Sequence, residues 1–177
     1  MIKAIHLDDR LIHGQVAISW TRSLGVDVLL VINDQIVNDQ MRRNALKLGV
    51  PAGVKFGFRS VEEGIRFLNS PESEKYKIMA LVNNAPDAEK VCLGVPGIKR
   101  LTIGGIRKDA PYIRDNLNLD SEDVRALKNL MEHGFEVGVL PTPSDRFVDL
   151  KPVLENFSKL KGENSENTIS CFNCGFM

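Results

Sequence analysis

The feature that most constrains the fold is an alternation of short apolar runs with longer amphipathic segments. Six runs are rich in Val, Ile and Leu, and several of them are almost continuously apolar, which is typical of strands buried on both faces of a parallel sheet. They span Ile2 to Leu7, Val26 to Ile32, Val54 to Phe58, Lys77 to Asn83, Ile98 to Ile103 and Phe135 to Leu140. The alternation predicts an α/β fold of βαβ units, an open sheet with helices on both faces.

The segments between these runs carry helix signals. In the second segment Val37, Met41, Ala45 and Leu48 recur at three- or four-residue spacing, which predicts one helix with these residues on its buried face. The run Ser60-Val-Glu-Glu63 is a capping box that opens the third helix. The predicted helices span Ile12 to Leu24, Val37 to Leu48, Val61 to Asn69, Asp87 to Leu93, Ser121 to His133 and about Asp149 to Leu160. Residues 106–119 are less clear and hold an irregular piece or an extra strand.

The length of 177 residues is enough for one full core but not for two large domains. We therefore expect one domain over residues 1–161 and a loosely held tail over residues 162–177. The 23 Lys and Arg balance the 23 Asp and Glu, so a nucleic-acid partner, which needs a clustered basic excess, is not expected.

The longest apolar runs have about five residues, whereas a membrane helix needs about 20. Together with the absence of a signal-peptide pattern at the start, this predicts a cytoplasmic protein. The cysteines Cys92, Cys171 and Cys174 are odd in number, so no disulfide framework is expected. The Cys171/Cys174 pair lacks two further ligands, so we expect no metal site there.

The chemistry should lie in the loops that follow the strands, because ligands of open α/β sheets bind beyond the carboxyl ends of the strands. The first such loop, Leu7-Asp-Asp-Arg-Leu-Ile-His-Gly-Gln15, is the most informative. It holds two carboxylates, a guanidinium and an imidazole within six residues. It also opens a helix, whose free N–H groups and dipole favour an anion.

This loop has the parts that phosphoryl transfer through a phosphohistidine requires. A neutral ring nitrogen of His13 is a competent nucleophile near neutral pH, and the planar fork of Arg10 suits phosphate oxygens. Gly14 leaves room for a tetrahedral group. Asp8 and Asp9 would hold Arg10 or fix the tautomer of His13. The residues by themselves fit two plainer interpretations as well, a surface histidine and a solvated turn with a local ion pair.

The run Asp8-Asp-Arg-Leu-Ile-His-Gly-Gln-Val16, followed by Trp20, closely resembles the signature of the IIB component of the mannose/fructose/sorbose family of the bacterial sugar phosphotransferase system (PTS). The resemblance implies that His13 is the phosphorylated histidine and that Arg10 steadies the phosphoryl group. Weaker similarities extend it over about residues 1–160. They are Val31-Ile-Asn-Asp34, Ile103-Gly-Gly-Ile106 and Leu140-Pro-Thr-Pro-Ser-Asp145.

The resemblance carries further expectations. It implies a seven-stranded, mostly parallel sheet, so a seventh strand should lie near residues 106–119 or at the end of the chain. The partners would be a IIA domain as phosphoryl donor and the membrane subunits IIC and IID, which hold the acceptor sugar. Self-association and the absence of a cofactor are also implied, while the sugar stays open. Two features depart from the family pattern, namely the basic pair Arg107-Lys108 and the tail from Gly162.

Other polar residues follow the same edge of the sheet. Asn33 and Asp34 either line the site or form an ordinary turn and helix start. Gly104 and Gly105 would let backbone N–H groups approach a phosphate or a partner loop, or would form a plain turn. Arg107 and Lys108 would help to dock a phosphorylated partner, or simply add charge to the surface.

Three other functions compete with phosphoryl transfer. A regulatory or binding domain on the same scaffold is the main alternative, because fold does not determine function. A phosphoaspartate receiver needs an acceptor Asp after the third strand, where this chain has Phe58-Arg59. A nucleotide-dependent kinase lacks its phosphate-binding loop here. Trp20 is expected in the core, and His6 and His133 are expected to be structural.

Overall fold

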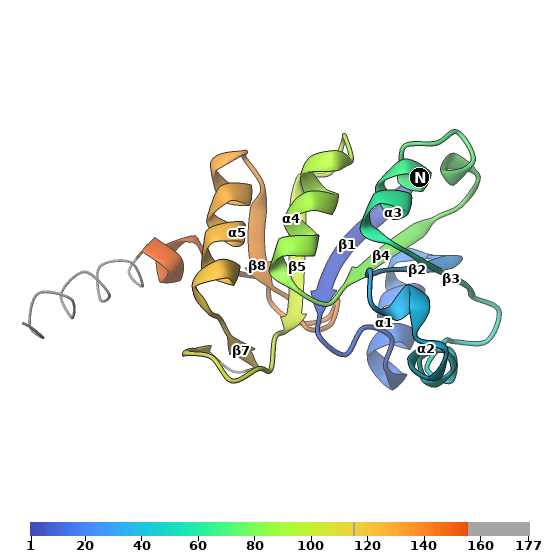
Figure 1. The fold of residues 1–177 in the computed structure, drawn as a ribbon, viewed down its shortest axis with the longest axis horizontal. Helices are drawn as coiled ribbons and strands as arrows, with labels where there is room; N and C mark the ends of the chain where they lie inside the picture. Colours follow the sequence, from blue (N-terminus) through green and yellow to red (C-terminus); the bar gives the residue numbers. More distant parts are fainter. Residues whose placement is uncertain (115, 156–177) are drawn as a thin grey trace, which may run out of the picture.

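The computed structural model describes residues 1–114 and 116–155. A seven-stranded sheet forms its centre (Figure 1). Its strands are β1 (Ile2–Asp8), β2 (Val28–Ile32), β3 (Lys55–Arg59), β4 (Ile78–Val82), β5 (Arg100–Gly105), β8 (Glu136–Val139) and β9 (Val148–Asp149). The order across the sheet is β3-β2-β4-β1-β5-β8-β9, in which β9 pairs antiparallel to β8 and every other pair is parallel. The predicted mostly parallel α/β sheet is therefore confirmed.

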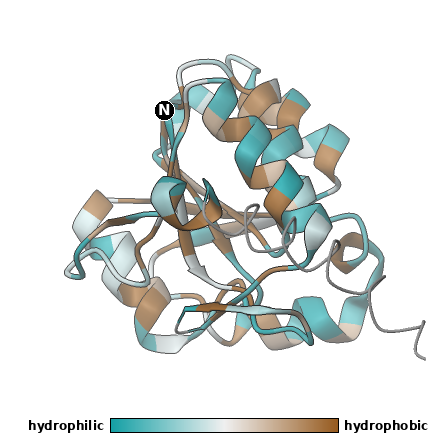
Figure 2. Cartoon of the chain, turned by 90° about the vertical axis from the view of Figure 1, so that its left-hand side faces the viewer, coloured by the Kyte–Doolittle hydropathy of each residue, from teal (hydrophilic) through white to brown (hydrophobic). Residues whose placement is uncertain are grey.

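Helices cover both faces of the sheet. They are α1 (Gly14–Leu24), α2 (Gln40–Lys47), α3 (Val61–Leu68), α4 (Ala85–Gly94) and α5 (Ser121–Glu132), with short 3-10 turns η1 (Ile36–Asn38) and η2 (Ser73–Lys75). Helices α3, α4 and α5 lie side by side on one face (Figure 1). Strand alternation separates two cores, because Leu30 and Ile32 pack toward these helices while Leu29 and Val31 pack toward α1. Figure 2 shows the apolar strands at the centre.

The sequence left two places open for the seventh strand, residues 106–119 or the end of the chain, and the structure shows the second. It is β9, near the end of the described chain, and it covers the outer edge of β8. The other alternative, residues 106–119, forms a separate antiparallel pair, β6 (Tyr112–Arg114) with β7 (Leu117–Asn118). The six strands predicted from apolar runs all lie within or close to the predicted ranges.

The prediction of one helix over Val37–Leu48 is wrong in two respects. Asp39 is extended (φ −102°, ψ 93°) and accepts a hydrogen bond from the Arg42 N–H (2.9 Å), so it ends η1 and caps a separate α2. The expected buried face is also wrong, because Met41 is 83% exposed and Leu48 is 90% exposed. Helix α2 buries none of its residues.

The remaining helix predictions are largely confirmed. The capping box of Ser60 and Glu63 opens α3, and α5 begins at the predicted Ser121. The last helix was predicted from Asp149, which instead lies in β9, and the described helical residues are 151–155. The rest of that prediction, the proposed boundary at residue 161 and the Cys171/Cys174 pair lie outside the described residues. In the described part of the chain, no helix is long and apolar enough to cross a membrane.

Candidate active site

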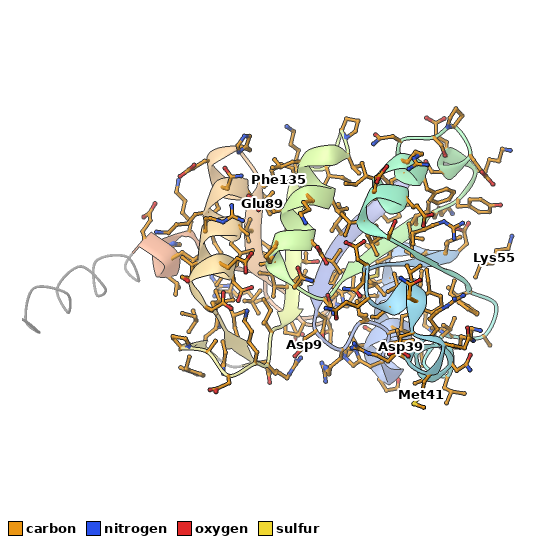
Figure 3. The ribbon with its side chains drawn as sticks, viewed as in Figure 1. Asp9, Asp39, Met41, Lys55, Glu89 and Phe135 are labelled. Carbon is orange, nitrogen blue, oxygen red and sulfur yellow. The ribbon has the colours of Figure 1, made fainter. Side chains whose placement is uncertain are left out.

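The loop between β1 and α1 leaves the middle of the sheet, because β1 lies between β4 and β5. Side chains alternate along β1, so Ile5 and Leu7 pack in the core under α3–α5. His6 and Asp8 therefore point to the opposite face, the one that α1 covers, and both are 1% exposed. Asp9 lies at this end of the sheet (Figure 3).

Two arginines hold the two carboxylates of the loop. Asp8 Oδ1 accepts hydrogen bonds from the Arg10 backbone N–H (2.9 Å) and Nε (3.3 Å). Arg107 Nη1 lies 3.4 Å from the same oxygen and also pairs with Asp9, whose Oδ2 accepts the Arg107 N–H (2.8 Å). Burial by itself would raise the pKa of Asp8, but the Arg10 hydrogen bonds and the charges of His13 and Arg10 hold this pKa below its usual value.

His13 is the N-cap residue of α1, with extended backbone (φ −147°, ψ 119°) and a side chain that is 23% exposed. Its Nδ1 lies 3.2 Å from the Leu11 carbonyl oxygen, and its Nε2 lies 4.0 Å from Asp8 Oδ2. The Nε2 atom is buried and has no hydrogen-bond partner in the described structure. The contact with the Leu11 carbonyl requires a proton on Nδ1, because a carbonyl oxygen only accepts.

The backbone before and after His13 shapes the loop. Leu11 adopts φ 58°, a left-handed conformation that is uncommon for a branched residue, and its N–H donates to the Asp8 carbonyl (2.9 Å). This turn places the His13 ring beside Asp8. Gly14 has φ 38° with no atom within 4 Å of the position that a Cβ would take, so the space next to His13 is open. Gln15 is exposed and follows Gly14 in the first turn of α1.

A second histidine lies directly beneath Asp8. The His6 Nδ1 is 2.9 Å from the Thr102 hydroxyl, and the His6 ring packs 5.0 Å from the Trp20 ring between centroids. A Cβ at Gly104 would lie 2.4 Å from Asp8 Oδ2 and 2.8 Å from His6 Nε2. Gly104 therefore makes room for these two side chains. Burial lowers the pKa of His6 to about 4, with the Asp8 charge opposing this shift and the His13 charge adding to it.

His6 was predicted to be structural, and neither it nor Thr102 was predicted as part of the site. The signal that would have found His6 is its spacing of two residues from Asp8, which places both on one face of β1. Trp20 is buried as predicted, and its Nε1 donates to the Pro141 carbonyl (3.1 Å) in the loop after β8.

The structure places the predicted residues Asn33 and Asp34 in local roles. Asn33 is buried, and its side chain accepts the N–H of Ile36 (2.9 Å) and donates to Asn83 Oδ1 (2.8 Å). Asp34 Oδ1 accepts the Val61 N–H (2.8 Å) at the start of α3. Among the described residues, none of these hydrogen bonds reaches the loop of residues 8–15.

The loop after β5 contributes to the site through Arg107. The Gly105 carbonyl accepts the Asp9 N–H (3.1 Å), and a Cβ at Gly105 would lie 2.5 Å from the Arg107 guanidinium. Arg107 therefore folds back over Gly105 onto the two carboxylates. Lys108 instead pairs with Asp120 and with buried Asp123 at the start of α5. This pairing argues against the suggestion that Lys108 docks a partner.

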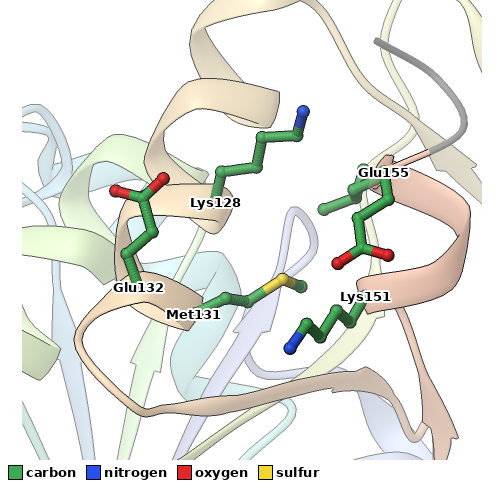
Figure 4. Close-up of a pocket in the computed structure, with 6 residues that line it drawn as sticks. Lys128, Met131, Glu132, Lys151 and Glu155 are labelled. Carbon is green, nitrogen blue, oxygen red and sulfur yellow. The ribbon is translucent and has the colours of Figure 1, made fainter. Parts of the chain in front are cut away.

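A separate hollow lies away from this loop. Figure 4 shows a pocket of about 250 Å³ between α5 and residues 151–155, whose lining includes Lys128, Met131 and Glu155. Within residues 1–114 and 116–155, no group of three or more His, Cys, Asp or Glu side chains is placed to hold a metal ion. The β1–α1 loop thus remains the place where nucleophile, charges and helix N-terminus meet.

The strand next to β1 also argues against a phosphoaspartate receiver. β4, which pairs with β1, is followed by Asn83 and Asn84, and β3 lies at the edge of the sheet and ends at Arg59. Neither position offers the acceptor carboxylate that a receiver needs.

Comparison with known proteins agrees with this geometry. Residues 2–166 match the family model of the PTS system sorbose subfamily IIB component. A probable phosphotransferase enzyme IIB component of Streptococcus pyogenes is 35% identical over 138 residues, which cover 74% of this chain and 85% of that protein. The fructose-specific EIIB component of Bacillus subtilis is 30% identical, with 86% of this chain and 95% of that protein covered.

Two further relatives extend the comparison. The mannose-specific EIIAB component of Escherichia coli K12 is 29% identical over 90% of this chain, but the chain spans only 50% of that protein. The crystal structure of the IIB domain of the sorbose permease from Klebsiella pneumoniae superposes with a TM-score of 0.82 at 26% identity, covering 88% of this chain and 97% of that domain. The family match, which spans most of the chain, and the likeness of the fold lead to one conclusion: the chain belongs to the sorbose subfamily of PTS IIB components, a family of sugar phosphotransferases.

Proposed function

We propose that this protein accepts a phosphoryl group on His13 from a phosphohistidine of a IIA domain and transfers it to a sugar held by membrane IIC and IID subunits. The observation that carries the proposal is the position of His13 at the N-terminus of α1, next to Asp8 with its two arginines. The EIIAB relative joins A and B components in one protein, which supports a IIA partner for this chain. The transfer would take place at the cytoplasmic face of the transporter.

The geometry supports Nδ1 of His13 as the acceptor nitrogen. In the resting ring Nδ1 carries the proton, because the Leu11 carbonyl only accepts, and Nε2 lies 4.0 Å from Asp8 Oδ2. When Nδ1 leaves the Leu11 carbonyl, it gives its proton to solvent and Nε2 takes one up toward Asp8, so the lone pair moves to Nδ1. Nδ1 then attacks phosphorus, while the N–P bond of the donor histidine breaks and its electrons return to the donor ring. In the second transfer a sugar hydroxyl attacks phosphorus, its proton goes to a base, and the His13 N–P bond breaks.

The negative charge of the phosphoryl group would be stabilised by Arg10 and by the N-terminus of α1. The Arg10 guanidinium is 48% exposed, so it can turn from Asp8 toward phosphoryl oxygens without unfolding the loop. The N-terminal N–H groups of α1 and the helix dipole favour the same anion. Arg107 stays on Asp8 and Asp9 and holds these carboxylates in place. Positioning and charge are the main requirements of phosphoryl transfer.

The central test is phosphorylation by a IIA donor. The protein should acquire an acid-labile, base-stable phosphate, and His13→Ala should abolish it. His133→Ala is the matched control, because His133 is exposed at the end of α5, where its Nδ1 bonds to the Asn129 carbonyl (2.8 Å). Full labelling of the His13→Ala variant would refute the assignment.

A second test addresses Arg10. Arg10→Ala should slow phosphoryl transfer about 100- to 1,000-fold, the range typical when one donor to a developing oxyanion is removed. The fold should survive, because this side chain is half exposed and the backbone N–H of residue 10 still reaches Asp8. Arg10→Lys should recover part of the rate, since it keeps the charge but loses the fork. Transfer rates equal to wild type in Arg10→Ala would remove Arg10 from the mechanism.

Sugar uptake separates this proposal from a purely regulatory domain. Cells that lack the protein should lose phosphorylating uptake of one sugar, and a panel of mannose, fructose, sorbose and amino sugars with matched membrane subunits identifies it. Uptake that persists in such cells would favour a regulatory role.

A further inference from the structure

The buried ring of His6 has one nitrogen without a partner, and this nitrogen lies beside the working carboxylate. His6 is 1% exposed, and its Nε2 makes no hydrogen bond in the described part of the chain. A Cβ on Gly104 would be within 2.8 Å of this Nε2 and within 2.4 Å of Asp8 Oδ2. The two atoms therefore border the same space above Gly104, without an ion pair between them within 4.0 Å. An unsatisfied buried nitrogen normally costs about 1–3 kcal/mol, so its presence calls for an explanation.

The hydrogen bonds of Thr102 determine which His6 nitrogen lacks a proton. The Thr102 hydroxyl donates to the Ile5 carbonyl (3.3 Å), so its single proton is used. The contact of 2.9 Å between Thr102 Oγ1 and His6 Nδ1 then requires Nδ1–H as the donor. In the neutral ring Nε2 carries a lone pair, and the charge of the nearby Asp8 acts on this ring. Nε2 is thus an empty proton site next to a carboxylate.

The charge balance of the loop changes when a phosphoryl group arrives. Asp8 and Asp9 are matched by Arg10 and Arg107 in the present structure. A phosphoryl group on His13 adds about −1.5 to −2 charges at neutral pH and draws Arg10 away from Asp8. Asp8 then remains buried with less compensation, and the low dielectric around it makes a nearby proton site more favourable.

We propose that His6 is a positioning residue that takes up a proton when an anion occupies the His13 site, and that it then donates from Nε2 to Asp8 Oδ2. The proton comes from solvent, and both His6 nitrogens then donate, Nδ1 to Thr102 and Nε2 to Asp8. This hydrogen bond holds Asp8 in place and frees Arg10 for the phosphoryl oxygens. The inference rests on the anion at His13 that the proposed function supplies.

The groups that face His6 are few. On its own strand the charged neighbour is Asp8, and in the following loop it is His13. Strand β4 presents Leu81 in register with His6, α1 presents Trp20, and β5 presents Thr102, none of which is charged. The guanidinium groups of Arg10 and Arg107 contact Asp8 and make no hydrogen bond to His6 in the described part of the chain. A change in the protonation of His6 therefore reports chiefly on Asp8 and on the charge at His13.

The test is NMR titration of the histidine ring nitrogens in the full chain, assigned with His6→Gln, His13→Gln and His133→Gln. The rings are compared from about pH 5.5 to about pH 8.5 before and after chemical phosphorylation with phosphoramidate, with ³¹P NMR to verify the phosphohistidine. Phosphorylation should raise the pKa of His6 from about 4 into the titrated range, a rise of at least about two pH units, with Nε2 gaining the proton. The exposed His133 ring is the internal control and should not shift.

Two variants keep the inference separate from the proposed function. If phosphoramidate leaves His13 unlabelled, the proposed function is in doubt, and His13→Asp carries the test by placing a fixed carboxylate there. His13→Asp should raise the pKa of His6 relative to the neutral His13→Gln, and the rise should shrink when Asp8→Asn is added. An unchanged His6 pKa in His13→Asp, or in protein that ³¹P NMR shows to be phosphorylated, would overturn the inference.

Discussion

Acidification from about pH 6.5 to about pH 4 should destabilise the protein through His6. Burial lowers the folded-state pKa of His6 to about 4, whereas a histidine in the unfolded chain titrates near 6.5. Between these values the unfolded chain binds a proton that the folded protein excludes. Stability is therefore fully present above about pH 6.5, falls as the pH falls through this window, and loses no more through His6 below about pH 4.

The size of the loss follows from the width of the window. Each pH unit between the two pKa values is worth about 1.4 kcal/mol, so His6 accounts for about 3 kcal/mol. This is a large part of the roughly 5–15 kcal/mol that holds a typical domain together. Asp8 affects stability in a lower pH range. Because its folded-state pKa is lowered, its stabilising contribution is lost only as the pH falls below the usual 3.8.

Urea unfolding at several pH values between about 7 and 4.5 measures the effect, with His6→Gln as the comparison. Wild type should lose about 2–3 kcal/mol more than His6→Gln over this range, since glutamine does not titrate. The control His133→Gln should follow wild type. Parallel stability curves for wild type and His6→Gln would show that the buried ring titrates as it does in the unfolded chain, which would refute the reasoning.

Two pairs of substitutions test the packing. Gly104→Ala should lower the free energy of unfolding by about 1–3 kcal/mol and slow phosphorylation, because the new methyl would lie 2.4 Å from the buried Asp8 carboxylate. Gly57→Ala is the control, because its Cβ would meet its nearest atom at 3.4 Å, and it should change thermal unfolding and phosphotransfer little. Leu127→Ala should cost about 2–5 kcal/mol, because this side chain is fully buried. Leu48→Ala, at a side chain that is 90% exposed, should change the unfolding midpoint little, and a large loss there would contradict the observed packing of α2.

The strands were predictable because buried parallel strands leave near-continuous apolar runs, and β2 and β4 show this clearly in Val28–Ile32 and Ile78–Val82. β9 lacked such a signal, since two residues at an antiparallel edge are too few for any periodicity. The second helix was wrong because spacing alone does not distinguish a buried stripe from an exposed one. The competing signal was Asp39, whose side chain caps α2 and splits the segment.

The site was predictable where it is local in sequence and not where it depends on contacts between strands. The loop from Asp8 to Gln15 supplies the nucleophile, the guanidinium and the helix start in one stretch. Arg107 was expected to meet a partner, but it meets Asp8 and Asp9 from 98 or more residues away. His6 shares a face of β1 with Asp8 through local spacing, but its partner Thr102 comes from the pairing of β1 with β5, which no local pattern shows.

The central position of β1 has a consequence for the order in which the protein is built. β1 pairs with β4 and β5, so Leu7 is in register with Val82 and with Ile103. Such long sequence separations are slow to close, because loop-closure entropy must be overcome before the contacts form. Residues 8–13 are synthesised well before Gly104 and Arg107. Arg10 can pair with Asp8 locally, but Asp9 gains its partner Arg107 only after β5 has joined the sheet. The phosphoryl-accepting loop should therefore be among the last parts to mature, and a nascent chain should gain phosphate-accepting ability abruptly once β5 has left the ribosome.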